Sequence, residues 1–245
     1  MFAFRITKEG HLEQVDTSSF LTPGNKILYE IYKDKDGKLW VSAFDVESFI
    51  IDIRDYIVQK YPLPDLRNQL KANPAINSLC KDEDGIFWFS QDRYGLCIYD
   101  SRKEKLKHYS QCQGTRNLPF GDVTNIARSY NHNWIWATSY GPTVFGLSQQ
   151  NMEMKEDVRI ELGNVTNNPG LITSLFEDPQ NNLWIGTTTG LFVYRIMSAT
   201  LESIPEVSGP VAGITQTADS RIWTVIRNKG IYRIEQDKGI ESYPF

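Results

Sequence analysis

Residues able to carry catalysis are few and scattered in this sequence. The three histidines, His11, His108 and His132, fall at an expected strand start, in an expected fourth strand and in a turn, which is typical of surface histidines. The chain has no G-x-S-x-G elbow, no H-E-x-x-H zinc motif and no phosphate-binding glycine loop. We therefore expect no enzyme activity from this chain, no metal site and no cofactor.

The cysteines do not form a recognisable metal-binding or disulfide pattern. Cys80, Cys97 and Cys112 lack the paired spacing of a metal site. An odd number cannot form a closed disulfide framework, although one pair remains possible. We expect small apolar core residues.

A second group of residues has the chemistry of ligand binding. Arginine and amide side chains donate in-plane hydrogen bonds, and a tyrosine ring beside them offers a flat apolar surface. The candidates are Asp92, Arg93, Tyr94, Arg116, Asn117, Tyr140, Arg227 and Asn228. They lie far apart in the sequence, so only the fold can bring them together.

An internal repeat supplies that fold. Five tryptophans, separated by 48, 48, 48 and 39 residues, are Trp40, Trp88, Trp136, Trp184 and Trp223. Around them, residues 33–43 read KDKDGKLWVSA and residues 81–91 read KDEDGIFWFSQ. Apolar residues recur 12 and 9 positions before each Trp, except in the third copy, where they stand one position further away. A repeat of this period indicates a stack of similar units.

Each unit is predicted to contain four short strands. The dipeptides ending in Gly37 and Gly85 favour a tight hairpin turn between the first two strands, because glycine accepts positive φ. A glycine after the Trp, as at Gly95 and Gly190, opens a third strand, and a fourth follows. Four-stranded units at this spacing are the signature of a β-propeller. The five tryptophans are then expected to be buried wedges between blades.

The expected fold is therefore an all-β propeller of four-stranded antiparallel blades, with five full blades and a half blade. We predict one domain over 1–245, with the half blade at about 1–20. The full blades are placed at about 26–61, 75–112, 122–160, 171–205 and 211–245. Because residues 1–20 supply only outer strands, we expect a partial ring from a six- or seven-bladed parent.

The repeat resembles the two-component regulator propeller repeat, I-x-x-L-x-x-D-x-x-G-x-L-W-[IV]-G-T followed by G-L-x-x-Y. The best matches are residues 171–195, LITSLFEDPQNNLWIGTTTGLFVYR, and residues 75–100, AINSLCKDEDGIFWFSQDRYGLCIYD. The copies at Trp40 and Trp223 match less closely, and the copy at Trp136 is degenerate. No Trp is followed by Asp, which argues against the WD-repeat family.

The resemblance implies a function. Such repeats are typical of the extracytoplasmic sensor half of hybrid two-component histidine kinases in gut Bacteroidetes, where they resemble glycan sensors. It implies an oligosaccharide ligand, a periplasmic location, and partners among the other domains of the parent or a second copy of the chain. The kinase itself would lie elsewhere in that parent.

Composition limits the partners. The chain has 26 Lys and Arg against 30 Asp and Glu, a net charge of −4, and no basic block, so nucleic acid is not an expected partner. No apolar run approaches the roughly 18 residues of a membrane span. Two alternatives to the ligand sensor stay open, namely a non-catalytic interaction or dimerisation propeller and, less favoured, a propeller lyase or hydrolase.

Overall fold

The computed structural model describes six strands between residues 3 and 60, and then residues 76–81, 85–91, 95–100, 102–103, 105–109, 122–132, 134–150, 153–235 and 239–245. Side chains are described from residue 77 onward. The chain divides into two compact units, Met1–Pro62 and Leu63–Phe245, which we describe separately. That both belong to one propeller domain stays a prediction.

The first unit contains two antiparallel sheets. Strands β1 (Ala3–Ile6) and β2 (Leu12–Val15) form a two-stranded sheet. The other sheet is four-stranded, in the order β3 (Leu28–Lys33), β4 (Lys38–Ala43), β5 (Phe49–Asp52) and β6 (Ile57–Lys60). Gly37 and the segment between Pro62 and Pro74 lie outside the described residues.

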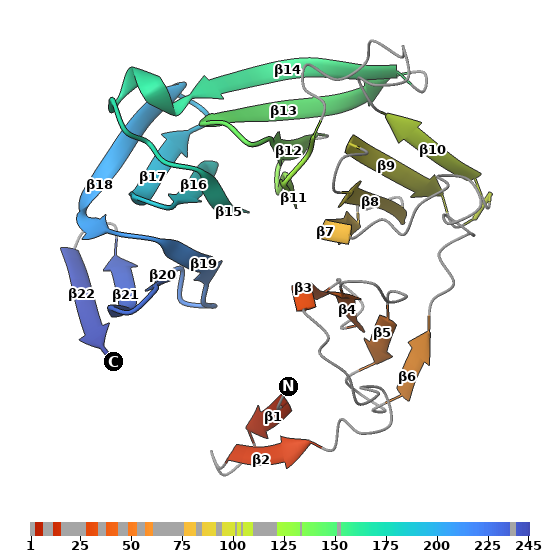
Figure 1. Cartoon of the computed structure of the whole chain (residues 1–245), viewed down its shortest axis with the longest axis horizontal. Helices are drawn as coiled ribbons and strands as arrows, with labels where there is room; N and C mark the ends of the chain where they lie inside the picture. The colour runs from red at the N-terminus through yellow and green to blue at the C-terminus, as the bar shows by residue number, and fades with distance from the viewer. Residues whose placement is uncertain are drawn as a thin grey trace. The chain divides into compact units, whose positions relative to one another are not determined.

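The second unit contains four antiparallel sheets of four strands each, and every strand pairs with its neighbour in sequence (Figure 1). We call these sheets blades two to five, counting β3–β6 as blade one. Blade two is β7 (Ile76–Lys81), β8 (Ile86–Gln91), β9 (Gly95–Asp100) and β10 (Lys105–Tyr109). Blade three is β11 (Asn125–Arg128), β12 (Ile135–Thr138), β13 (Thr143–Gln150) and β14 (Glu153–Glu161). Blade four is β15 (Ile172–Glu177), β16 (Asn182–Thr187), β17 (Gly190–Arg195) and β18 (Thr200–Ser208). Blade five is β19 (Val211–Gln216), β20 (Ile222–Ile226), β21 (Gly230–Glu235) and β22 (Gly239–Pro244).

These sheets confirm the predicted fold class, an all-β propeller of four-stranded antiparallel blades. Among the described residues the helical content is one short 3₁₀ turn, Leu162–Asn164. The extra residue expected in the third repeat is also confirmed. Residues 129–134 separate the paired Arg128 and Ile135, whereas residues 178–182 separate the paired Glu177 and Leu183.

The five repeat tryptophans all lie on second strands. Their third-strand partners differ, and the pairs are Trp40 with Ile50, Trp88 with Ile98, Trp136 with Gly146, Trp184 with Val193 and Trp223 with Arg233. Trp88, Trp136 and Trp184 are buried, and Trp223 is half-buried. The side chain of Trp40 lies outside the described part of the structure.

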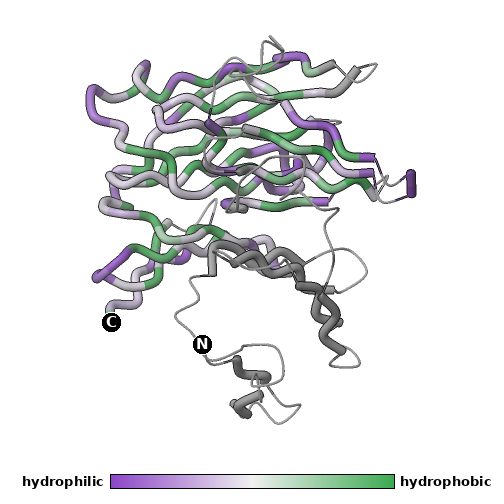
Figure 2. The backbone as a smooth tube through the Cα atoms, turned by 45° about the vertical axis from the view of Figure 1, so that its right-hand side comes forward, coloured by the Kyte–Doolittle hydropathy of each residue, from purple (hydrophilic) through white to green (hydrophobic). Residues whose placement is uncertain are grey.

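Each buried tryptophan of the last three blades packs toward the next blade. Trp136 shares one apolar cluster with Ile172 and Phe192 of blade four. Trp184 shares another with Val211 of blade five. Apolar colours follow the strands and hydrophilic colours gather at many of the turns (Figure 2). The inter-blade cores are therefore made by residues from neighbouring repeats.

Polar side chains join the first strands of successive blades. Ser78 Oγ donates to Ile126 O at 3.1 Å, Asn125 Nδ2 to Ile172 O at 3.3 Å, and Thr173 Oγ1 to Val211 O at 2.8 Å. Each bond satisfies a backbone carbonyl on the first strand of the next blade. Gly85 lies directly before β8, in the expected turn between the first two strands of blade two. Its φ of +81° is in the left-handed region that favours glycine.

Candidate functional site

The loops expected to carry the ligand site gather at one end of blades three to five. We call this end the ligand face. It consists of the turns 139–142, 188–189 and 227–229, the connections 162–171 and 209–210, and Phe245, which follows the last strand. It is built from the turns between second and third strands and from the connections between blades. In an antiparallel blade both kinds of loop lie at the same end of the strands.

Hydrogen bonds hold the first part of each turn to the segment that enters its blade. In blade three the donor is a side chain, Thr124 Oγ1, which bonds to Ser139 O at 3.2 Å. In blades four and five the bonds are between backbone groups. Thr188 N donates to Leu171 O at 2.9 Å, and Arg227 N donates to Pro210 O at 2.9 Å. In blade four a side chain makes a further bond between the turn and the connection, because Thr189 Oγ1 donates to Pro169 O at 2.8 Å.

The second part of each turn is held by the residue that leaves the fourth strand. The bonds run from the amide of Leu162 to Pro142 O, from Gly209 to Thr189 O and from Phe245 to Lys229 O, at 3.0, 2.9 and 3.3 Å. Each turn is thus fixed on both sides. The side chains on the ligand face project from an ordered backbone, which lowers the entropy cost of binding.

Three predicted ligand residues lie on this face. Tyr140 is 63% exposed, and Arg227 and Asn228 are exposed in the turn of blade five. Asn228 has a φ of +59°, a conformation that asparagine tolerates better than most residues. The remaining candidates, Asp92, Arg93, Tyr94, Arg116 and Asn117, lie outside the described residues, so their part in the site stays a prediction.

The apolar character of this face was not predicted from the sequence. Val165, Leu171 and Phe245 are exposed by 38%, 51% and 80%. An apolar residue in a loop or beside the end of a strand gives no sequence signal of exposure, because the same residue types fill the core. Together with Tyr140 they give the ligand face scattered apolar contact points beside polar turns.

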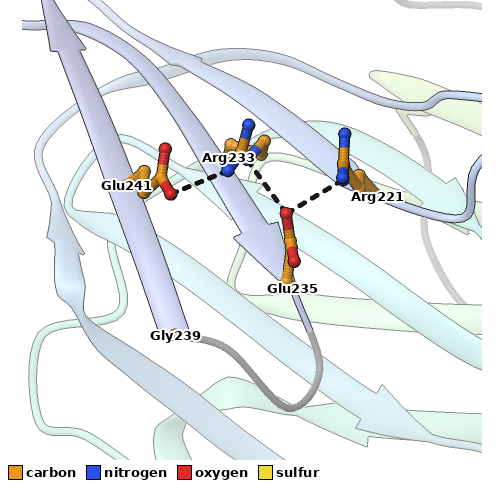
Figure 3. Close-up of a pocket in the computed structure, with 5 residues that line it drawn as sticks. All are labelled: Arg221, Arg233, Glu235, Gly239 and Glu241. Carbon is orange, nitrogen blue, oxygen red and sulfur yellow. Dashed lines mark ion pairs between the residues drawn. The ribbon is translucent and has the colours of Figure 1, made fainter.

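The opposite end of blade five has a hollow of about 270 Å³ (Figure 3). Its lining is four charged residues and one glycine, namely Arg221, Arg233, Glu235, Glu241 and Gly239. Arg221 Nε lies 2.9 Å from Glu235 Oε1, and Arg233 Nη2 lies 2.7 Å from Glu241 Oε1. Arg233 Nε lies 3.2 Å from the same Glu235 oxygen, so the four side chains form one chain of ion pairs.

This hollow is neutralised by its own residues. Both guanidinium groups already face carboxylates, so neither offers an uncompensated charge to an anion. Aromatic rings lie beside it, because the Arg233 guanidinium is 5.9 Å from the Trp223 ring, which stacks on Tyr243. The hydrogen bond from Tyr243 to Glu241 raises the pKa of the phenol. The network therefore covers the half-buried Trp223, and we do not assign a ligand to it.

Two of the three cysteines are buried thiols. Cys80 lies on β7 and Cys97 on β9, and burial raises the pKa of Cys97 far above its usual value. Cys112 lies outside the described residues.

Among the described residues, no group of three or more His, Cys, Asp or Glu is placed so that it could hold a metal ion. No helix in the described part of the chain is long and apolar enough to cross a membrane.

Comparison with known proteins identifies the repeat. Residues 168–189, which cover the turn and the Trp of blade four, match the family model of the two component regulator propeller. No curated protein sequence matches the chain.

Solved structures share the fold at low sequence identity. The extracellular domain of a hybrid two-component system of B. thetaiotaomicron, BT3049, is 17% identical with a TM-score of 0.69, over 96% of this chain and 31% of that one. The corresponding domain of BT4673 from the same organism is 16% identical with a TM-score of 0.60, over 92% of this chain and 34% of that one. PorZ, a surface component of the type-IX secretion system of Porphyromonas gingivalis, is 13% identical with a TM-score of 0.59, over 89% of this chain and 33% of that one.

The chain thus spans about a third of the length of these structures. Its repeat and its blades agree with the resemblance drawn from the sequence. Residues 168–189 therefore resemble the two component regulator propeller, and the chain as a whole shares the β-propeller fold of these extracellular domains.

Proposed function

We propose that this chain is a ligand-sensing propeller module of the extracytoplasmic, periplasmic part of a hybrid two-component signalling protein. Its ligand is a glycan-derived oligosaccharide, and its partners are the other domains of that parent. The chain itself carries out no catalysis, and a histidine kinase elsewhere in the parent would transmit the signal.

The observation that carries the proposal is the ligand face. Its turns are fixed on both sides by hydrogen bonds, and they present Tyr140, Arg227 and Asn228 to solvent. An ordered backbone that presents exposed side chains on loops is the usual arrangement of a recognition surface. The likeness to extracellular domains of hybrid two-component systems supports the same reading.

The chemistry of these side chains suits a sugar. A guanidinium donates paired hydrogen bonds to hydroxyl or carboxylate oxygens, and a tyrosine ring stacks on the apolar face of a pyranose. The amide of Asn228 both donates and accepts, as hydroxyl groups do.

Titration calorimetry with a panel of neutral and acidic oligosaccharides tests the proposal. The double variant Tyr140→Ala with Arg227→Ala should weaken binding by about 1–3 kcal/mol for each lost contact. A matched control is Tyr130→Ala with Arg102→Ala, because Tyr130 is 61% exposed and both residues lie at the opposite end of their blades. The control should bind as the unchanged chain does.

A protein-interaction propeller is the second candidate. The exposed Leu171 and Phe245 favour it, since apolar groups on a rigid face also suit a protein partner. The same experiments separate the two functions. Light scattering that shows self-association, lost in Leu171→Ser with Phe245→Ser, together with no heat from any oligosaccharide, would replace the sensor by this second function.

A further inference from the structure

The turn of blade three encloses a carboxylate that belongs to blade four. Glu177, the last residue of β15, is 5% exposed. Its Oε1 accepts hydrogen bonds from Ser129 Oγ at 3.0 Å, from Tyr130 N at 3.0 Å and from Asn131 N at 3.3 Å. Its Oε2 accepts the indole N–H of Trp136. All four donors belong to blade three, so one side chain joins two blades.

The neighbouring blades satisfy their tryptophans in a different way. Trp184 Nε1 donates to Asp178 Oδ2 at 2.9 Å, and Trp223 Nε1 donates to Thr217 Oγ1 at 3.1 Å. Both acceptors stand six residues before the Trp, in the same blade. Asp34 and Asp82 occupy the same position in the first two repeats.

Blade three has lost this acceptor. Allowing for its extra residue, the position six before the Trp corresponds to Ser129, whose hydroxyl is used to donate to Glu177 rather than to accept from Trp136. At the position of Glu177 the first, second and fifth repeats have Lys33, Lys81 and Gln216. The acidic residue at this position is therefore found in blade four, which directly follows the blade that lacks its own acceptor.

We propose that Glu177 is an inter-blade clamp, which replaces the missing acceptor of blade three and locks the angle between blades three and four. A buried carboxylate surrounded by four donors gains strong charge-assisted hydrogen bonds, and it leaves four unsatisfied donors when it is removed. A second contact supports the same joint, because Asn131 Nδ2 donates to Pro179 O at 3.2 Å and to Asn181 Oδ1 at 3.0 Å. The clamp lies at the end of the blades opposite the ligand face, so it sets the spacing of the loops without occupying the site.

Hydrogen exchange measured by NMR on the whole chain tests the clamp. In Glu177→Gln the carbonyl oxygen that remains can keep the three donors of residues 129–131, which leaves the amide nitrogen facing the Trp136 indole, so protection of the Trp136 indole N–H should fall by roughly 5- to 150-fold. The Trp184 indole should keep its protection. The control Asp178→Asn should do the reverse, exposing Trp184 and sparing Trp136.

A rescue variant decides between a clamp and a merely packed side chain. Adding Ser129→Asp to Glu177→Gln restores an acceptor within blade three, at the position that holds aspartate in three other repeats. We expect protection of the Trp136 indole to return. If Glu177→Gln does not fold, folding of the double variant supports the clamp. Unchanged Trp136 protection in Glu177→Gln, or no recovery in the double variant, overturns it.

Discussion

Truncating the repeat tryptophans should reveal a gradient set by inter-blade packing. Trp136 is fully buried, and its ring lies in the cluster between blades three and four. Loss of a buried Trp side chain to alanine costs about 3–5 kcal/mol of unfolding free energy. The Trp136→Ala variant also removes one donor from the buried Glu177 carboxylate, which adds about 1–3 kcal/mol.

Replacing the tryptophan of blade five by alanine should cost less unfolding free energy. Trp223 is half-buried, and its indole bonds to Thr217 at the surface. Half of the usual transfer term gives a cost of about 1–2 kcal/mol for Trp223→Ala. Trp184→Ala should resemble Trp136→Ala in its transfer term, because Trp184 is 6% exposed.

Equilibrium urea unfolding followed by far-ultraviolet circular dichroism measures these costs, since it does not depend on which Trp fluoresces. The m-value of each variant checks that the unfolded states are comparable. The conservative Trp136→Phe keeps most of the apolar ring and removes the N–H, so it isolates the hydrogen bond. Equal costs at Trp136 and Trp223 would refute the argument that the next blade buries the wedge.

Two further predictions concern packing. The Gly186→Ala variant should lose about 1–3 kcal/mol of unfolding free energy, because the added Cβ would overlap Val211 of the adjacent blade. The control Gly163→Ala should be close to neutral, since nothing lies within 4 Å of its added Cβ. The urea midpoints of the two variants measure the difference. In a Cys112→Ser background, Cys80 and Cys97 should resist a thiol-labelling reagent until the chain unfolds, because both are buried and the pKa of Cys97 is raised. Mass spectrometry counts the labelled thiols, and rapid labelling of the folded chain would contradict the burial of these residues.

The repeat was enough to predict most of the strands. The Trp spacing placed the second strands, and the glycines after it placed the starts of β9, β17 and β21 at Gly95, Gly190 and Gly230. These signals are local, because turn geometry and strand alternation act over a few residues. The extra residue of the third repeat was visible for the same reason.

Contacts between blades could not be predicted in this way. The hydrogen bond from Trp136 to Glu177 joins residues 41 positions apart, and the sequence around Trp136 does not indicate which residue accepts it. The stacking of Trp223 on Tyr243 likewise joins β20 to β22, two strands that are separated by β21 in the sheet. The ligand face lies between these cases, since topology placed Tyr140 and Arg227 in its turns but did not show which apolar neighbours are exposed.

Hydrogen–deuterium exchange with and without a bound oligosaccharide tests the central claim most directly. The chain is titrated with the tightest-binding member of the panel, and peptides covering both ends of the blades are compared. We predict slower exchange in residues 139–142, 188–189 and 227–229, and no change in the turns 129–134 and 178–182. Protection confined to those opposite turns, or protection at neither end, would contradict the assignment of the ligand face.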